Sequence, residues 1–158
     1  NLPYYITSPV IMTLLESKLP IEEIVVMVQK EAAERFCAEI GSRNSGAVTV
    51  AVNYYADAEM LFEVPKSCFH PAPKVDSAVM KLTLRDKPPI DVKDERHFFT
   101  VVKAAFAQRR KTALNCLSNG LGISKNQVLS ALNTIGKNEK SRAENFTLEE
   151  FAKLSELI

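Results

Sequence analysis

The sequence predicts an α/β fold in two parts, a mixed part of helices and strands followed by an all-helical part. A β-branched run at residues 24–28 and an alternating apolar pattern at 75–84 predict strands. The polar stretch 85–93, with two adjacent prolines, indicates a linker. After it, the apolar residues recur at helical spacing. We therefore expect one unit at residues 1–84, a linker at 85–93 and a helical unit at 94–158.

Two helices are predicted in the first part. Ser8 and Pro9 favour a helix start, because serine caps a helix and proline fits its first position. Apolar side chains follow at helical spacing, namely Val10, Ile11, Leu14 and Leu15. Pro20 ends this segment. A second helix is expected from Lys30 to Ile40, where Gly41 stops it.

Three strands are predicted around these helices. Ile24–Val28 is short and apolar, as in a buried strand. Met60–Val64 and Val75–Leu84 are the other two, joined by the proline-rich loop Pro65–Pro73. One face of the last strand would carry Ala78, Met80, Leu82 and Leu84.

The segment Ala47–Tyr55 fits two patterns. A strand would place on one face Val48, Val50 and Val52. A helix would place on one face Ala47, Val48, Ala51, Val52 and Tyr55. Periodicity alone leaves both structures open.

Four helices are expected in the second part. Phe98, Phe99, Val102 and Phe106 lie on one face of the first, and the second runs from Thr112 to Leu121, ending near Gly120 or Gly122. Two capping-box patterns begin the others, Ser124-x-x-Gln127 and Thr147-x-x-Glu150.

Composition excludes several classes of protein. No apolar run is long enough for a transmembrane helix, and no signal peptide is visible, so we expect no membrane partner. The cysteines are odd in number and widely spaced, with no CxxC pair, at Cys37, Cys68 and Cys116. Such cysteines are typical of reduced thiols in a cytoplasmic protein, and no metal site is predicted.

Charge is unevenly distributed although the net charge is only +1. Residues 1–84 contain 7 Lys/Arg and 10 Asp/Glu, whereas residues 85–158 contain 13 and 9. Residues 96–138 contain 7 Lys/Arg and no acid at all. Such a stretch predicts a surface that faces a polyanion.

The segment with the clearest chemistry is Asn1-Leu2-Pro3-Tyr4. It resembles the Asn/Asp-x-Pro-Tyr/Phe loop with which S-adenosylmethionine-dependent enzymes hold a planar nitrogen that they methylate, such as that of adenine. An exocyclic adenine amine is a poor nucleophile because its lone pair is delocalised into the ring. Two acceptors aimed at its hydrogens favour the geometry in which it attacks a methyl donor. The Asn1 side-chain oxygen and the Leu2 carbonyl can be those acceptors, Pro3 stiffens the turn, and Tyr4 offers a face on which a base can stack. An ordinary turn is the competing interpretation.

Three further segments favour the catalytic interpretation. They are Phe69–Val79 (FHPAPKVDSAV), Phe106–Asn115 (FAQRRKTALN) and Val28–Arg35 (VQKEAAER). Together with Asn1–Tyr4, and in this order, they resemble the small-subunit ribosomal RNA adenine N6,N6-dimethyltransferase family over nearly the whole chain. The resemblance implies the C-terminal part of a Rossmann-like S-adenosylmethionine-dependent methyltransferase sheet, followed by a small all-helical domain that docks on rRNA. It also favours a helix at Ala47–Tyr55.

The resemblance implies a role for each residue of the first segment. Asn1 and the Leu2 carbonyl would bind the target amine, with Pro3 between them and Tyr4 stacked on a flipped adenine. Asn1 and Pro3 would also border the cofactor. Phe69 would close over the base from the other side, although a core role competes. Tyr5 is expected to pack rather than to act.

RNA contacts are expected from cations elsewhere in the chain. Lys74, at the rim of the Phe69 loop, would touch a phosphate. Lys103, Arg109, Arg110 and Lys111 are the other expected backbone contacts, although at least one of the last three should pair within the protein.

The resemblance also implies that residues 1–158 lack most of the cofactor site. The family's glycine-rich cofactor loop is expected upstream of Asn1, so we expect an N-terminally truncated chain that is inactive alone, from a monomeric parent. Its incomplete sheet would expose an edge and favour self-association.

Two alternatives remain. In the first, the chain is a non-catalytic RNA-binding factor of ribosome assembly. In the second, it is part of a methyltransferase for another planar nitrogen, such as that of DNA adenine.

Overall fold

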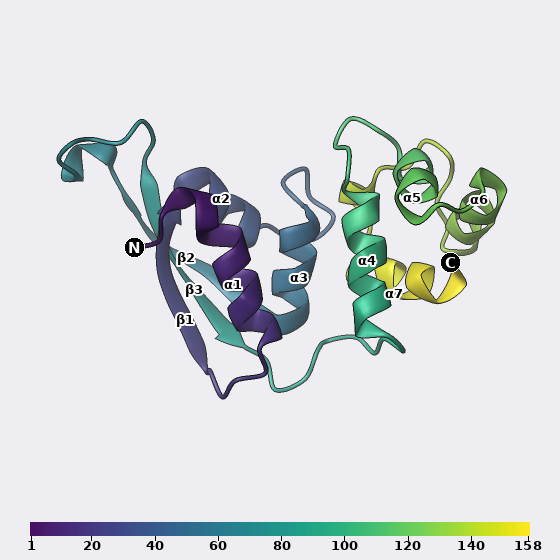
Figure 1. Ribbon diagram of the computed structural model, residues 1–158, viewed down its shortest axis with the longest axis horizontal. Helices are drawn as coiled ribbons and strands as arrows, with labels where there is room; N and C mark the ends of the chain where they lie inside the picture. The colour runs from purple at the N-terminus through teal and green to yellow at the C-terminus, as the bar shows by residue number, and fades with distance from the viewer.

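A three-stranded antiparallel sheet with helices packed on it forms the first part of the molecule (Figure 1). The structure is a computed structural model that describes residues 1–158. The helices here are α1 (Thr7–Glu16), α2 (Lys30–Phe36) and α3 (Ala47–Tyr55). The strands are β1 (Glu23–Gln29), β2 (Ala56–Val64) and β3 (Ser77–Leu84), in the order β1-β3-β2.

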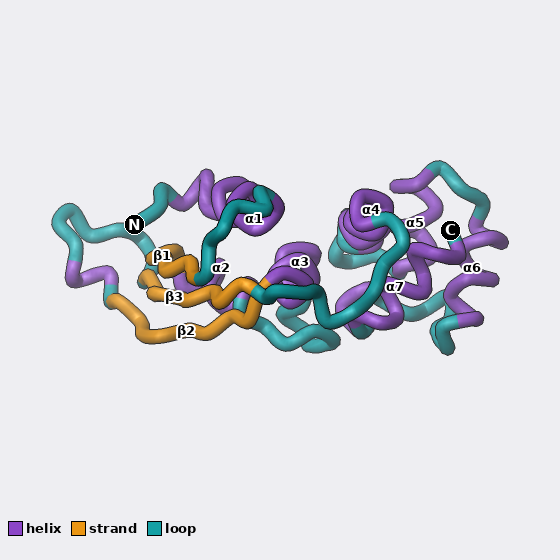
Figure 2. The backbone as a smooth tube through the Cα atoms, turned by 90° about the horizontal axis from the view of Figure 1, so that it is seen from below, coloured by secondary structure: helices purple, strands orange, loops and turns teal.

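The register of the sheet puts its apolar residues on one face. Ile24 of β1 pairs with Leu82 of β3, and Val28 pairs with Ala78. These four side chains are buried in a core completed by α1, α2 and α3, which include Ile11, Leu15, Ala33, Phe36 and Val52. The opposite face is more open, and Val25 is 56% exposed there. The sheet therefore has one helix-covered face (Figure 2).

Four capped helices form the second part. They are α4 (Glu95–Ala105), α5 (Ala113–Leu121), α6 (Lys125–Thr134) and α7 (Leu148–Leu157). Side-chain oxygens cap the N-terminus of each, from Asp94, Thr112, Ser124 and Thr147. Both predicted capping boxes are confirmed, and Gly122 ends α5 with a φ of 67°, a left-handed conformation that favours glycine. None of the helices has the length and apolarity that crossing a membrane requires.

Helix α3 joins the two parts because it contributes to both cores. Val52 packs with the sheet, whereas Val50, Ala51 and Tyr54 pack with α4 to α7. The rings of Tyr54 and Phe98 lie 5.5 Å apart. This burial on two sides explains the ambiguous pattern of Ala47–Tyr55, and the helix favoured by the family resemblance is confirmed.

Glu95 links α3 to α4 through two tyrosines. Its carboxylate accepts hydrogen bonds from the hydroxyls of Tyr54 (3.2 Å) and Tyr55 (2.6 Å). Burial, together with the Glu95 charge, raises the pKa of Tyr54 to about 12. Burial and the hydrogen bond to Glu95 also raise the pKa of Tyr55.

We expect the molecule to lose stability as the pH rises from about 10, the ordinary tyrosine pKa, toward about 12, the pKa of Tyr54 in the folded protein. In that window the unfolded chain has released protons that the folded protein still holds, so rising pH favours unfolding. Thermal midpoints measured across it should fall more steeply for wild type than for the Tyr54→Phe, Tyr55→Phe double variant. Equal slopes for the two proteins would contradict this account.

Some predicted boundaries are wrong. Helix α1 begins at Thr7 rather than at a Ser8 cap, because a 3-10 turn at Tyr4–Ile6 leads directly into it. Helix α2 ends at Phe36, four residues before Ile40. Strand β2 begins at Ala56, immediately after α3, which is earlier than the predicted Met60.

Candidate functional site

The Asn1–Tyr4 segment lies beside the end of strand β1. The Leu2 amide donates a hydrogen bond to the Met27 carbonyl (3.3 Å), which holds the segment against the sheet. The Pro3 carbonyl accepts from the amide of Ile6 (3.1 Å) and the hydroxyl of Thr7 (3.4 Å). The main chain of this turn is therefore fixed on both sides of Pro3.

Two acceptors of the same segment have no hydrogen-bond partner. They are the Asn1 side-chain oxygen and the Leu2 carbonyl, and neither accepts from any group of the chain. Asn1 is exposed and Leu2 is partly exposed. The turn thus carries two free acceptors on consecutive residues, and an amine with two hydrogens needs two acceptors.

Tyr4 is oriented by strand β3. Its hydroxyl lies 3.0 Å from the Ser77 hydroxyl, at the residue where β3 begins. The loop before Ser77 carries Phe69, which is partly buried. Asp76 closes the base of this loop, since its carboxylate accepts from the Lys66 amide at 2.9 Å. Tyr4 therefore lies beside the base of the loop that carries Phe69.

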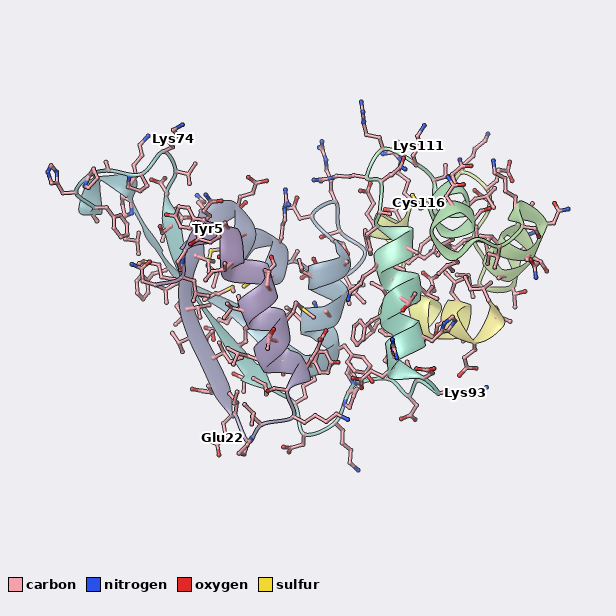
Figure 3. All side chains as sticks on the ribbon, viewed as in Figure 1. Tyr5, Glu22, Lys74, Lys93, Lys111 and Cys116 are labelled. Atoms are coloured by element: carbon pink, nitrogen blue, oxygen red, sulfur yellow. The ribbon has the colours of Figure 1, made fainter.

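Tyr5 does not pack as expected. The residue is 86% exposed, just before the start of α1 (Figure 3). It follows the turn fixed by Pro3 and lies outside both cores.

The cations Lys74 and Lys111 lie on the same side of the molecule, opposite Glu22 and Lys93 (Figure 3). Gln108–Lys111 forms a turn between α4 and α5, closed by a hydrogen bond from the Lys111 amide to the Gln108 carbonyl (2.9 Å). Arg109 pairs within the chain, because its guanidinium donates to the Arg43 carbonyl (3.2 Å). The side chains of Lys111 and the exposed Arg110 make no hydrogen bond or ion pair with the chain.

Comparison with known proteins matches the model of a family described as "Ribosomal RNA adenine dimethylase" over residues 1–158. The chain belongs to this family. Two curated relatives, both ribosomal RNA small subunit methyltransferase A, come from Geobacillus thermodenitrificans (49% identical) and Shouchella clausii (48%). The alignments cover 100% of this chain and 55% and 54% of those proteins. The chain thus spans about half the length of these relatives.

Two solved structures are similar to this member of the dimethylase family. A dimethyladenosine transferase from Plasmodium falciparum has a TM-score of 0.74 and 29% identity, over 98% of this chain and 63% of that one. The 23S rRNA methyltransferase ErmE has a TM-score of 0.67 and 25% identity, over 99% and 62%. The predicted fold class is confirmed, the C-terminal part of a Rossmann-like methyltransferase sheet followed by helices.

Not every predicted RNA contact of this dimethylase-family chain lies with the others. Lys103 is exposed on α4 and lines a separate hollow, together with the cations Lys18 and Arg96 and the acids Glu16 and Glu95. It is therefore not part of the group formed by the turn after α4.

Sequence reasoning missed a group of residues beside the basic turn. Arg35, Ser45 and Arg142 line a hollow of about 310 Å³ that also includes Arg109 and Lys111. Arg35, Ser45 and Arg142 are far apart in the chain, so only the fold brings them together. No group of three metal-ligating side chains gathers anywhere in the molecule.

Proposed function

We propose that this chain is part of an S-adenosylmethionine-dependent rRNA adenine N6,N6-dimethyltransferase. The enzyme would methylate two adjacent adenines of small-subunit rRNA, in the cytoplasm and during ribosome biogenesis. The observation that carries the proposal is the pair of unpartnered acceptors, the Asn1 side chain and the Leu2 carbonyl, on a turn held in place through the Leu2 amide and the Pro3 carbonyl.

The chain's own residues would bind and orient the target base. Asn1 and the Leu2 carbonyl accept the two amine hydrogens and favour the pyramidal nitrogen that attacks in line. Tyr4, fixed through Ser77, stacks on the flipped adenine, and Phe69 covers the base from the loop above. The proton of the product amine leaves to water, so the site needs no general base.

The residues of this chain fit only the sulfonium methyl end of the cofactor S-adenosylmethionine. S-adenosylmethionine supplies a methyl group activated on a sulfonium, and Asn1 and Pro3 would border that group. None of the five glycines lies in a strand-to-helix turn of the kind that binds a nucleotide; they are Gly41, Gly46, Gly120, Gly122 and Gly136. We therefore expect residues 1–158 on their own to transfer no methyl groups.

A surface formed by Lys74, Arg110 and Lys111 would hold the rRNA while the target base is flipped out of its stack. Lys74 lies on the Phe69 loop, and Arg110 and Lys111 lie on the turn after α4. Lys74 and Lys111 lie on the same side of the molecule, so one RNA could touch both parts (Figure 3). Phosphate contacts of this kind position the RNA without reading its sequence.

The test is methyl transfer by the complete reading frame. The substrates would be labelled S-adenosylmethionine and small ribosomal subunits that lack the modification, with the product nucleoside identified after digestion. Dimethyladenosine in the small-subunit rRNA is the expected result. Tight, salt-sensitive subunit binding without transfer would instead support a non-catalytic assembly factor, an alternative that the free cations Arg110 and Lys111 also favour.

A further inference from the structure

Two consecutive residues where β3 begins, Asp76 and Ser77, contact both segments that carry the proposed stacking aromatics. Ser77 is 1% exposed, and its hydroxyl lies 3.0 Å from the hydroxyl of Tyr4. The Asp76 carboxylate accepts a hydrogen bond from the Lys66 amide (2.9 Å), in the loop that also carries Phe69. One point of the sheet is therefore bonded to both sides of the proposed base site.

The main chain at this point is itself held by its neighbours. Ser77 pairs with Gln29 of β1 on one side and with Val64 of β2 on the other. The Asp76 carbonyl accepts a hydrogen bond from the Lys30 amide (3.0 Å), where α2 begins. The side chains of Asp76 and Ser77 thus start from a backbone that two strands and a helix fix, and such rigid elements hold a site precisely.

Tyr4 depends on Ser77 for its orientation. It is 38% exposed, and the Ser77 hydroxyl is the only hydrogen-bond partner of its side chain. Its ring packs on no other aromatic ring of the chain. A ring that is held before a base arrives loses less conformational freedom when it stacks. The bond to Ser77 therefore preorganises Tyr4.

Phe69 is linked to Asp76 through two hydrogen bonds. The Phe69 amide donates to the Lys66 carbonyl (3.2 Å), and the Lys66 amide donates to the Asp76 carboxylate. No other side chain forms a hydrogen bond to residues 65–75. Phe69 is also the one partly buried residue in the otherwise exposed stretch 65–72. The position of its ring therefore depends on the Asp76 side chain.

We propose that Asp76 and Ser77 are positioning residues that together fix the separation of Phe69 and Tyr4. The inference rests on the proposed function, because it takes these two rings as the walls of the adenine site. A planar base between two rings needs them about 7–8 Å apart, twice the best carbon–carbon contact distance. A shift of about 1 Å in one wall can cost as much as a hundredfold in rate. Neither residue would touch the base.

The first experiment is a double-mutant cycle on methyl transfer by the complete protein, with Ser77→Ala and Tyr4→Phe. Each substitution removes the same hydrogen bond, and each keeps the Tyr4 ring. Each should lower kcat about tenfold and leave the KM for small ribosomal subunits nearly unchanged. The double variant should be no slower than either single variant, because the two hydroxyls act as one unit.

Additive losses, about a hundredfold in the double variant, would show that Ser77 acts without the Tyr4 hydroxyl and would overturn its positioning role. Tyr4→Phe changes a partly exposed hydroxyl and keeps the ring, so the prediction stays testable if Ser77→Ala does not fold.

Asp76→Ala and Asp76→Asn test the other wall. Asparagine keeps a side-chain oxygen that can accept from the Lys66 amide, whereas alanine does not. Asp76→Ala should therefore lower kcat about tenfold, and Asp76→Asn should stay close to wild type. Asp86→Ala is the matched control, because Asp86 is an exposed linker aspartate in none of the ion pairs, and it should have no effect. Equal losses from alanine and asparagine at position 76 would overturn the role of this hydrogen bond.

NMR relaxation of labelled aromatic rings in the complete protein measures the two walls without any chemistry. The Tyr4 ring should become more mobile in Ser77→Ala, and the Phe69 ring in Asp76→Ala, while the buried Tyr54 ring stays unchanged in both. Unchanged mobility of Tyr4 and Phe69 would overturn the proposal even in an active enzyme. Because this measurement needs no methyl transfer, it remains decisive for the inference if the wild-type protein proves inactive and the proposed function fails.

Discussion

Replacing Asn1 by alanine in the complete protein is expected to lower methyl transfer about a hundredfold to a thousandfold, the usual cost of removing one preorganised hydrogen-bonding group from an active site. The Asn1 side chain has no partner in the chain, so the substitution leaves no internal group unsatisfied. Stability should therefore be unchanged. Affinity for rRNA should also stay nearly the same, because the proposed phosphate contacts lie elsewhere. Single-turnover methyl transfer and equilibrium rRNA binding measure the two effects separately.

Asn126→Ala is the matched control for this prediction. Asn126 is an exposed asparagine in the first turn of α6, outside every proposed contact. Its replacement should leave both transfer and binding unchanged. If Asn1→Ala lowered transfer and rRNA affinity by the same factor, Asn1 would act in RNA docking rather than in holding the amine.

Phe98→Ala is expected to destabilise the molecule by about 3–5 kcal/mol, the range measured for removal of a buried phenylalanine. Phe98 is 0% exposed, and its ring lies 5.5 Å from that of Tyr54 and 5.0 Å from that of Phe99. The cavity would open between α3 and α4, where the two parts meet. Since whole domains are stable by only about 5–15 kcal/mol, the loss would be a large fraction of the total.

Phe62→Ala provides the comparison for Phe98, because the same atoms are removed from a ring that is 57% exposed on β2. Its cost should be well below that of Phe98→Ala in chemical denaturation. A similar cost at both positions would mean that the joint between α3 and α4 contributes no more than the open face of the sheet.

Local patterns predicted much of this fold. Ser124 and Thr147 signalled helix starts because a capping box is complete within four residues. The alternation through Ala78, Met80 and Leu82 identified the buried face of β3 because that strand pairs on both sides and packs helices on one face. The start of α1 was missed because the turn at Tyr4–Ile6, rather than a side-chain cap, begins it.

The candidate site also has a part that a local sequence pattern predicted and a part that it did not. The Asn1–Tyr4 segment could be proposed from the sequence because its groups are consecutive and its chemistry requires that spacing. The Tyr4–Ser77 contact and the hollow at Ser45 and Arg142 could not, because they join residues far apart in the chain. Such contacts depend on strand order and on the placement of α3, which no local pattern encodes.

Helix α3 belongs to both cores and is tied to α4 by the two tyrosine hydroxyls on Glu95. A joint of this kind gives the two parts little freedom to swing. The distance from the Asn1–Tyr4 turn to the cations after α4 is then fixed. In the proposed complex, an RNA held at those cations would present to Asn1 only the nucleotides that lie at this distance from the point of contact. Neighbouring bases could thus be chosen by distance, without any side chain reading the sequence around them.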